Sequence, residues 1–271
     1  MIELRTASPN YALRLAARRV HEESPSPPMT ESILLSAASV ATFNGQNPLT
    51  NASGFFFERD GRLFLVTSRH VMIDAPSEHF PDRIEIELHS DRENLARTTG
   101  FSIPLYQGGQ SVWRQGTDSA GAIDVAAIEI DRSALPETTA IRSFTPMHLI
   151  ASHDTVEIGT PVLILGFPLG FYDHLHRIPI ARQAIVASSF ALRFQGEGYF
   201  LTDARTHRGS SGAPVIMRVA QPKAAHRDLP WMLLGVHSAR FDMGSREATE
   251  DEALGLNCAW FADILLALTE R

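Results

Sequence analysis

The chain has 271 residues, of which 44% are hydrophobic, and its formal net charge is −7 with an isoelectric point near 5.9. A chain of this length and apolar content can bury a substantial core. The 24 Lys and Arg residues are outnumbered by 31 Asp and Glu residues and are scattered, which speaks against a nucleic acid or an anionic membrane as the partner.

The first 31 residues predict an N-terminal extension with a short helix and a Pro-rich linker. Leu, Ala and Val side chains recur among arginines at roughly helical spacing over residues 11–23, and the run 24–28, SPSPP, ends any helix. A helix packed on the outside of the domain is favoured over a segment that binds a partner or blocks access to a site.

The apolar stretches and the number of cysteines indicate the cellular compartment of the protein. Arginines interrupt the N-terminal apolar residues, so no signal-peptide core is recognised, and no later stretch approaches the ~20 apolar residues of a membrane span. Cys258 is the only cysteine, which excludes an intrachain disulfide. These features predict a cytoplasmic protein.

The remaining residues, 32–271, predict one domain that contains two groups of strands. Short β-rich runs separated by Gly, Pro, Asn and Asp fill about 32–131 and again about 156–256. Residues 132–157 have weaker periodicity and two prolines, as expected of a connection between the groups. An apolar-striped C-terminal helix is predicted over about 257–269.

A candidate nucleophile lies in the run Gly209–Pro214, GSSGAP, which has the form G-x-S-G-x-P around Ser211. Gly209 allows a turn tight enough to direct two backbone N–H groups, those of Gly209 and Ser211, at one point. Such a pair of donors would bind the oxyanion that develops when a serine attacks a carbonyl. The loop therefore predicts a nucleophilic serine with an oxyanion hole.

A serine nucleophile needs a base and a carboxylate that orients the base. His70 ends the apolar run FLVTSRH, and Asp124 lies in IDVAAIEI, a mostly apolar strand in which a carboxylate requires an explanation. Asp118 and Asp131 are weaker candidates because their surroundings indicate solvated loops. Taken singly, each candidate could have a purely structural role: Ser211 as a turn serine, His70 as a core histidine and Asp124 as a surface carboxylate. Together, in the order His70, Asp124, Ser211, they favour a catalytic triad.

With these three motifs the chain resembles the trypsin-like serine peptidases of the bacterial type, close to the high-temperature-requirement proteases and the glutamyl endopeptidases. The resemblance covers roughly residues 32–268. It implies an all-β, chymotrypsin-like fold of two packed six-stranded antiparallel β-barrels with a C-terminal helix, so that the two groups of strands are the two barrels. Further segments that fit the family are 52–56, 159–168, 202–204 and 234–238.

The resemblance also implies which residues bind the substrate. The side chain before the scissile bond would meet Arg205 at the base of its pocket and Thr206 on the wall, and Ser238 would also face Asp124. Glutamyl endopeptidases have a threonine and a histidine at the positions of Thr206 and His237, where they bind an acidic side chain, whose burial needs donors. The alternative is that His237 packs inward and Thr206 only stabilises its loop. The strand that would pair with the substrate backbone is His237, Ser238, Ala239 and Arg240.

These observations favour a serine endopeptidase that acts on proteins or peptides, with a regulatory protein partner as a further prediction. The alternative is a catalytically idle module that binds a peptide or a partner in its cleft, and the complete triad argues against it. An esterase would use the same nucleophile. No metal and no cofactor are predicted, because the pair His174 and His176 lacks further ligands.

Overall fold

The computed structural model describes residues 31–152, 155–220, 228–238 and 255–271. The chain divides into two units, Met1–Thr30 and Glu31–Arg271, and the description below concerns the second. The predicted N-terminal helix and linker therefore lie outside the described residues. Among the residues described, no helix is long and apolar enough to cross a membrane.

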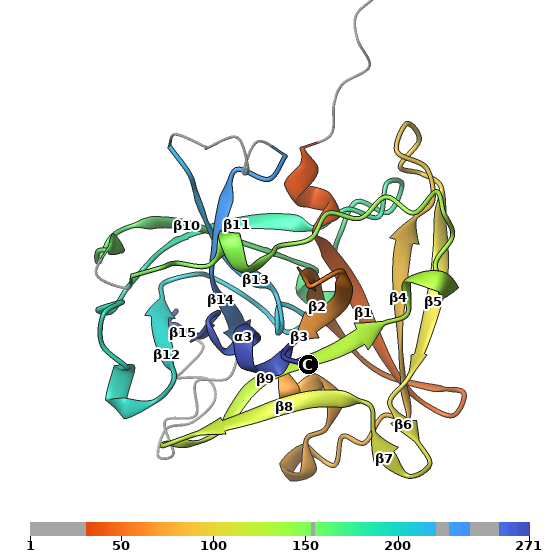
Figure 1. Ribbon diagram of the computed structural model, residues 1–271, viewed down its shortest axis with the longest axis horizontal. Helices are drawn as coiled ribbons and strands as arrows, with labels where there is room; N and C mark the ends of the chain where they lie inside the picture. Colours follow the sequence, from red (N-terminus) through yellow and green to blue (C-terminus); the bar gives the residue numbers. More distant parts are fainter. Residues whose placement is uncertain (1–30, 153–154, 221–227, 239–254) are drawn as a thin grey trace, which may run out of the picture. The chain divides into compact units, whose positions relative to one another are not determined.

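The first sheet contains seven antiparallel strands in the order β5-β4-β1-β2-β3-β9-β8 (Figure 1). The sequence predicted six. At the two ends of the strand order, β5 pairs with β4 and β8 pairs with β9. The β6–β7 hairpin separates these two strands, and the Val112 N–H donates to the Leu105 carbonyl (3.0 Å) across its base. The strands are β1 (Ala37–Asn44), β2 (Asn47–Arg59), β3 (Arg62–Thr67), β4 (Arg83–His89), β5 (Thr98–Pro104), β6 (Tyr106–Gln107), β7 (Gln110–Ser111), β8 (Trp113–Asp118) and β9 (Gly121–Ile130).

The second sheet contains six antiparallel strands in the order β11-β10-β13-β14-β15-β12. Its two edges meet, because Val186, directly after β11, forms a bridge with Thr202 at the end of β12. The predicted all-β architecture of two curled sheets is thus confirmed, and the sheets are called barrel one and barrel two below. The strands of barrel two are β10 (Pro161–Gly166), β11 (Ile180–Ile185), β12 (Tyr199–Thr202), β13 (Pro214–Arg218), β14 (Trp231–Ser238) and β15 (Asn257–Phe261).

Apolar side chains form one cluster inside each barrel and a third cluster between the barrels. In β2, Phe56 packs inside barrel one, whereas Phe55 and Phe57 pack in the cluster between the barrels. This alternation follows from the two-residue period of a strand, which sends successive side chains to opposite faces. Phe144, from the connection between the barrels, joins the middle cluster, where its ring meets the Phe55 ring edge-on at 5.8 Å.

The helices are short. A one-turn helix, α1 (Arg69–Met72), follows β3, and α3 (Ile264–Leu268) lies near the C-terminus. The predicted helix over 257–269 is therefore too long, since Asn257–Phe261 form β15 between β12 and β14. All five residues of β15 are buried. A short run that is buried throughout has no periodicity that separates a buried strand from a buried helix.

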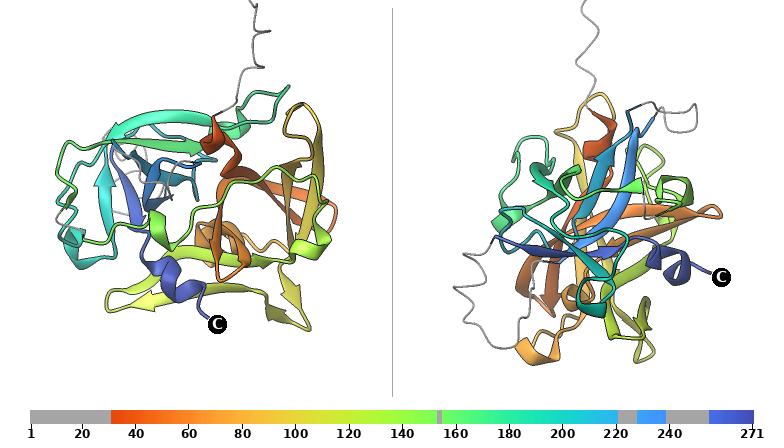
Figure 2. Two further views of the ribbon diagram at one scale, coloured as in Figure 1. Left: turned by 45° about the horizontal axis from the view of Figure 1, so that its top comes forward. Right: turned by 90° about the vertical axis from the view of Figure 1, so that its left-hand side faces the viewer.

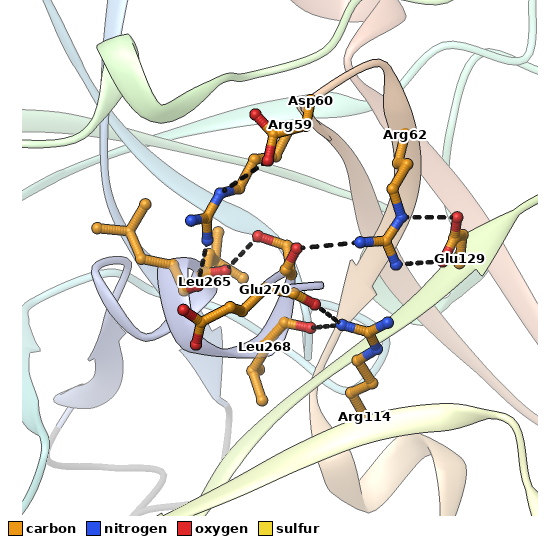
Figure 3. A network of polar contacts seen from close by, with 10 residues as sticks. Arg59, Asp60, Arg62, Arg114, Glu129, Leu265, Leu268 and Glu270 are labelled. Atoms are coloured by element: carbon orange, nitrogen blue, oxygen red, sulfur yellow. Dashed lines mark hydrogen bonds and ion pairs between the residues drawn. The ribbon is translucent and has the colours of Figure 1, made fainter.

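Arginines of barrel one bind the end of the chain (Figure 3). The Arg59 guanidinium donates to the Leu266 carbonyl, and Arg114 donates to the carbonyls of Leu268 (3.4 Å) and Glu270. Arg62 donates to the Thr269 carbonyl at 3.5 Å. The last carbonyls of a helix have no partner inside the helix, so these contacts satisfy them. They attach the C-terminal segment to barrel one, beside β8 and β9 (Figure 2).

Candidate active site

Asp124 and His70 are neighbours at one end of barrel one. Thr67, the last residue of β3, lies opposite Ala126 in β9, so the turn after β3 brings His70 to the side chain of Asp124. The Asp124 carboxylate accepts three hydrogen bonds: from the His70 ring at Nδ1 (2.7 Å), from the His70 backbone N–H (2.9 Å) and from the Ser238 hydroxyl (2.9 Å). The contact between Ser238 and Asp124 is the one that the sequence predicts.

These contacts determine the protonation of the pair. Burial raises the pKa of Asp124, but the hydrogen bonds and the charge of His70, with the Ser238 hydroxyl, outweigh burial and hold that pKa below its ordinary value. An ionised carboxylate can only accept, so Nδ1 of His70 carries a proton. In the neutral imidazole, Nε2 then carries the free lone pair, which is the state required of a general base.

The serine loop, residues 208–213, joins β12 to β13 and has two glycines with positive φ: Gly209 at +93° and Gly212 at +84°. A Cβ atom at Gly209 would lie 2.6 Å from the Phe167 carbonyl oxygen, and one at Gly212 would lie 2.2 Å from the Ser53 carbonyl oxygen. Both the backbone conformation and the close packing therefore require glycine on either side of Ser211.

The serine loop packs against the residues that directly precede His70. A Cβ atom at Gly212 would lie 2.8 Å from Thr67 Cα. The His237 carbonyl accepts hydrogen bonds from the Gly212 N–H (2.8 Å) and from the Ser68 hydroxyl (3.3 Å). Within the described part of the chain, the Ser211 hydroxyl has no hydrogen bond. The hydrogen bond between a nucleophilic serine and its base is often long when no substrate is bound.

Four successive carbonyl groups of the serine loop accept hydrogen bonds, whereas the N–H groups of the buried residues Gly209 and Ser211 have no acceptor among the described residues. The carbonyls are those of Arg208, bound to the Leu169 N–H (2.6 Å), Gly209, bound to the Ser53 hydroxyl (2.7 Å), Ser210, bound to the Ala213 N–H (3.0 Å), and Ser211, bound to the Ser53 N–H (2.9 Å). The N–H groups of Gly209 and Ser211 donate to no residue that the structure describes. They are the two groups that the sequence predicts for an oxyanion hole.

The residues predicted to bind the substrate side chain have different surroundings. Arg205 is exposed, and Thr206 is half-buried with its hydroxyl bound to the Asn257 side-chain oxygen (2.7 Å). The Asn257 amide nitrogen donates to the Ala204 carbonyl. Because that carbonyl can only accept, the amide nitrogen must face it, which leaves the amide oxygen for Thr206. The Thr206 hydroxyl proton is therefore engaged. Ala239 and Arg240 lie outside the described residues.

His237 is fully buried in β14, and neither ring nitrogen has a hydrogen-bond partner among the described residues. Burial, and to a lesser degree the charge of His70, lowers the pKa of His237 to about 3, so its ring is neutral at ordinary pH. Buried polar atoms without a partner are rare in proteins. Among the described residues, the ring nitrogens of His237 are therefore left without a polar partner.

Sequence reasoning missed two buried polar residues at this site, Asn257 and Ser53. A signal for Asn257 was present, since it is the polar residue of the apolar run LNCAWF. Ser53 was noted only as part of the segment before the histidine strand. Most of its contacts are to backbone groups more than 100 residues away in the chain, which residue patterns do not reveal.

The weaker candidates have other partners. Asp118 forms an ion pair with Arg193, and Asp131 accepts from the Ser133 backbone N–H at the start of a short 3₁₀ turn. The His176 ring binds Asp173 (2.8 Å). The structure groups no three His, Cys, Asp or Glu side chains as a metal site within the residues it describes.

Three solved structures resemble this one at low sequence identity. An HtrA-type protease, AlgW, with a tripeptide is 16% identical with a TM-score of 0.50, and the match covers 86% of this chain and 58% of that chain. A serine endoprotease from Yersinia pestis is 17% identical with a TM-score of 0.48, covering 86% and 61%. The Rv3671c protease from M. tuberculosis, in its active form, is 16% identical with a TM-score of 0.49, covering 89% and 82%.

This chain thus spans 58% and 61% of the length of the first two of these proteins, and at 16% identity the first shows the fold alone. No curated protein matches the sequence. The model of the trypsin-like peptidase domain matches residues 52–220, which is 169 of the 271 residues, and the match includes His70, Asp124 and Ser211. The chain belongs to the trypsin-like peptidase family.

Proposed function

We propose that the protein hydrolyses peptide bonds through a triad in which Ser211 is the nucleophile, His70 the general base and Asp124 the group that orients the base. The observation that carries this proposal is the Asp124 carboxylate, which accepts from both the ring and the backbone of His70 beside the serine loop. It fixes the imidazole in the tautomer that a serine nucleophile requires.

In the proposed reaction His70 Nε2 takes the Ser211 hydroxyl proton as the serine oxygen attacks the carbonyl carbon of the scissile bond. The resulting oxyanion accepts from the N–H groups of Gly209 and Ser211, and the loss of one such donor costs about 3 kcal/mol of transition-state stabilisation. The intermediate then expels the amine, which takes the proton from His70, and leaves an acyl-enzyme. Water, deprotonated by His70, releases the acid and restores the serine.

The first experiment is intact-mass detection of labelling by a fluorophosphonate, which needs an activated serine but no known substrate. One adduct is expected on the wild type, and none on Ser211→Ala or His70→Ala. Ser210→Ala is the matched control, since it removes the neighbouring buried hydroxyl and should still be labelled. An adduct that persists in Ser211→Ala would contradict the assignment of the nucleophile. An unlabelled wild type would favour the idle binding module.

A preference for Glu or Asp before the scissile bond is the finer part of the proposal. The neutral ring of His237 has one N–H donor, and no described residue accepts from it. A buried carboxylate needs such a donor. Thr206 is the weaker candidate, because its hydroxyl proton already goes to Asn257. We therefore assign the recognition of the carboxylate mainly to His237.

Two fluorogenic peptides that differ only by Glu or Gln before the cleaved bond test this preference. The value of kcat/KM should be about tenfold or more higher for Glu, as a hydrogen bond to a charged group implies. His237→Gln should remove the preference and Thr206→Val should keep most of it. Equal or faster cleavage of the Gln peptide by the wild type would contradict an acidic preference. Comparison with simple esters separates peptidase from esterase activity, and the regulatory partner stays a prediction.

A further inference from the structure

Ser53 is a fully buried serine of β2, in barrel one, that touches the serine loop of barrel two. It lies opposite Ser39 of β1 and is followed by Gly54 and the apolar residues that pack in the cores. A buried hydroxyl is costly unless it is hydrogen-bonded, so its contacts explain its presence.

Every polar group of Ser53 has a partner. Its N–H donates to the Ser211 carbonyl (2.9 Å) and its hydroxyl donates to the Gly209 carbonyl (2.7 Å). The same hydroxyl oxygen accepts from the Phe167 N–H (2.9 Å), and the Ser53 carbonyl accepts from the Thr67 hydroxyl (2.7 Å). Ser53 thus contacts the serine loop, the segment after β10 and the residue that ends β3.

The direction of the hydroxyl hydrogen bond follows from these partners. The Gly209 carbonyl can only accept and the Phe167 N–H can only donate, so the single hydroxyl proton must lie toward Gly209. A Cβ atom at Gly166 would lie 2.7 Å from the Ser53 hydroxyl oxygen, which leaves no room for a side chain there. The hydroxyl is therefore held in one orientation by groups on both sides.

The Ser53 contacts fix the peptide units on either side of the one that carries the Ser211 N–H. A peptide unit is planar, with its C=O and N–H pointing in opposite directions. The hydroxyl fixes the Gly209–Ser210 unit and the Ser53 N–H fixes the Ser211–Gly212 unit. The N–H of Gly209 belongs to the preceding unit, whose Arg208 carbonyl is bound by Leu169 N–H, two residues after Phe167. Ser53 therefore supports the orientation of both N–H groups.

We propose that Ser53 is a positioning residue of the oxyanion hole, which it holds in place from the opposite barrel. The inference rests on the proposed function, because it assumes that these N–H groups bind the oxyanion. Gly209 has a backbone that rotates at little steric cost, so a bond to its carbonyl is the restraint that such a residue needs. Without the hydroxyl, the buried Gly209 carbonyl and Phe167 N–H both lose their partner.

The test is the kinetics of fluorophosphonate labelling in Ser53→Ala. In this reaction the serine oxygen bonds to phosphorus, fluoride leaves and His70 takes the proton, while a phosphoryl oxygen occupies the oxyanion hole. The labelling rate constant kinact should fall about tenfold to a hundredfold, since small displacements of catalytic groups have effects of this size. The half-saturating concentration KI should stay within about twofold, because the probe still binds.

Ser36→Ala is the matched control. Ser36 is another fully buried serine of barrel one, and its hydroxyl donates to the Ile33 carbonyl (2.7 Å). Its loss should lower the Tm as the Ser53 variant does and leave kinact unchanged. Ser53→Cys keeps the shape of the side chain with a larger γ atom and replaces the hydroxyl with a weaker donor, so it should also lower kinact. It takes the place of Ser53→Ala if the alanine variant does not fold.

The outcomes separate the two proposals. A wild type without labelling would contradict the proposed activity itself. A labelled wild type whose kinact equals that of folded Ser53→Ala, or a loss that Ser36→Ala reproduces, would overturn the positioning role and leave the triad unaffected. A fall in kinact confined to the Ser53 variants would support it.

Discussion

Asp124 determines which nitrogen of His70 carries a proton, and its amide counterpart should reverse that choice. In Asp124→Asn the amide nitrogen would donate to Nδ1, so the proton would move to Nε2 and the base would lose its lone pair. We expect kcat/KM to fall by roughly 10³- to 10⁴-fold. Asp118→Asn is the control, since Asp118 pairs with Arg193 instead. Activity of Asp124→Asn within tenfold of the wild type would argue against the assigned tautomer.

His237 should make the stability of the fold depend on pH. Its folded pKa of about 3 lies below the ordinary value of 6.5, so between these values the unfolded chain binds a proton that the folded protein excludes. The free energy of unfolding should therefore fall as the pH decreases from about 6.5. The loss due to this group should reach roughly 2–3 kcal/mol at pH 4.5, at about 1.4 kcal/mol per pH unit.

Urea unfolding at pH 7 and pH 4.5 measures this dependence. His237→Gln, which cannot take up the proton, should show a smaller fall in the free energy of unfolding between the two pH values. His79→Gln serves as the control, because the His79 ring reaches the Val71 carbonyl at the surface of barrel one. An equal fall in the wild type and in His237→Gln would show that other groups dominate.

At the residue scale, functional residues can be predicted where their sequence context is chemically unusual, and they are missed where that context is ordinary. A carboxylate inside an apolar strand and a serine between glycines are unusual enough to attract attention. Ser53 and Asn257 are common polar residues whose partners are mostly backbone groups and lie as far as 156 residues away. Nothing in a local pattern reports a contact with a distant carbonyl.

At the element scale, the C-terminal segment is attached to barrel one by arginines that bind its carbonyls. Arg114→Ala should lower the free energy of unfolding by about 1 kcal/mol, because it removes the donor to Leu268 and Glu270 at the end of α3. Arg92→Ala, at an exposed position of the same barrel, should change it by less than about 0.5 kcal/mol. Equal stabilities of the two variants in urea unfolding would contradict a stabilising role for Arg114.

The same segment shows which elements a sequence pattern can identify. Several strands of barrel one alternate or end at clear turn residues, and β-rich runs are predicted there, although the sheet has seven strands where six are predicted. β15 has neither signal, because all five of its residues are buried between β12 and β14. The sequence pattern also singles out no run for β5 or β8, whose places in the sheet depend on pairing with β4 and β9.

At the scale of the whole molecule, the site depends on the packing of the barrels, because His70 and Asp124 come from one and Ser211 from the other. Phe144→Ala would leave a cavity in the middle cluster and should lower the free energy of unfolding by about 3–5 kcal/mol. Phe80→Ala, at a site 47% exposed, is the matched control and should cost far less. A Phe144 variant as stable as the Phe80 variant in urea unfolding would show that the middle cluster does not hold the barrels together.

The serine loop is held mainly through its main-chain groups, so its backbone geometry depends little on the identity of an exposed side chain. Arg208 is exposed and contributes a carbonyl contact that any residue could make, whereas the Ser210 side chain is buried. Random mutagenesis of Arg208 should therefore yield many variants with an intact nucleophile, whereas Gly209 and Gly212 should tolerate no replacement. The loop offers protein engineers one adjustable position within a fixed backbone.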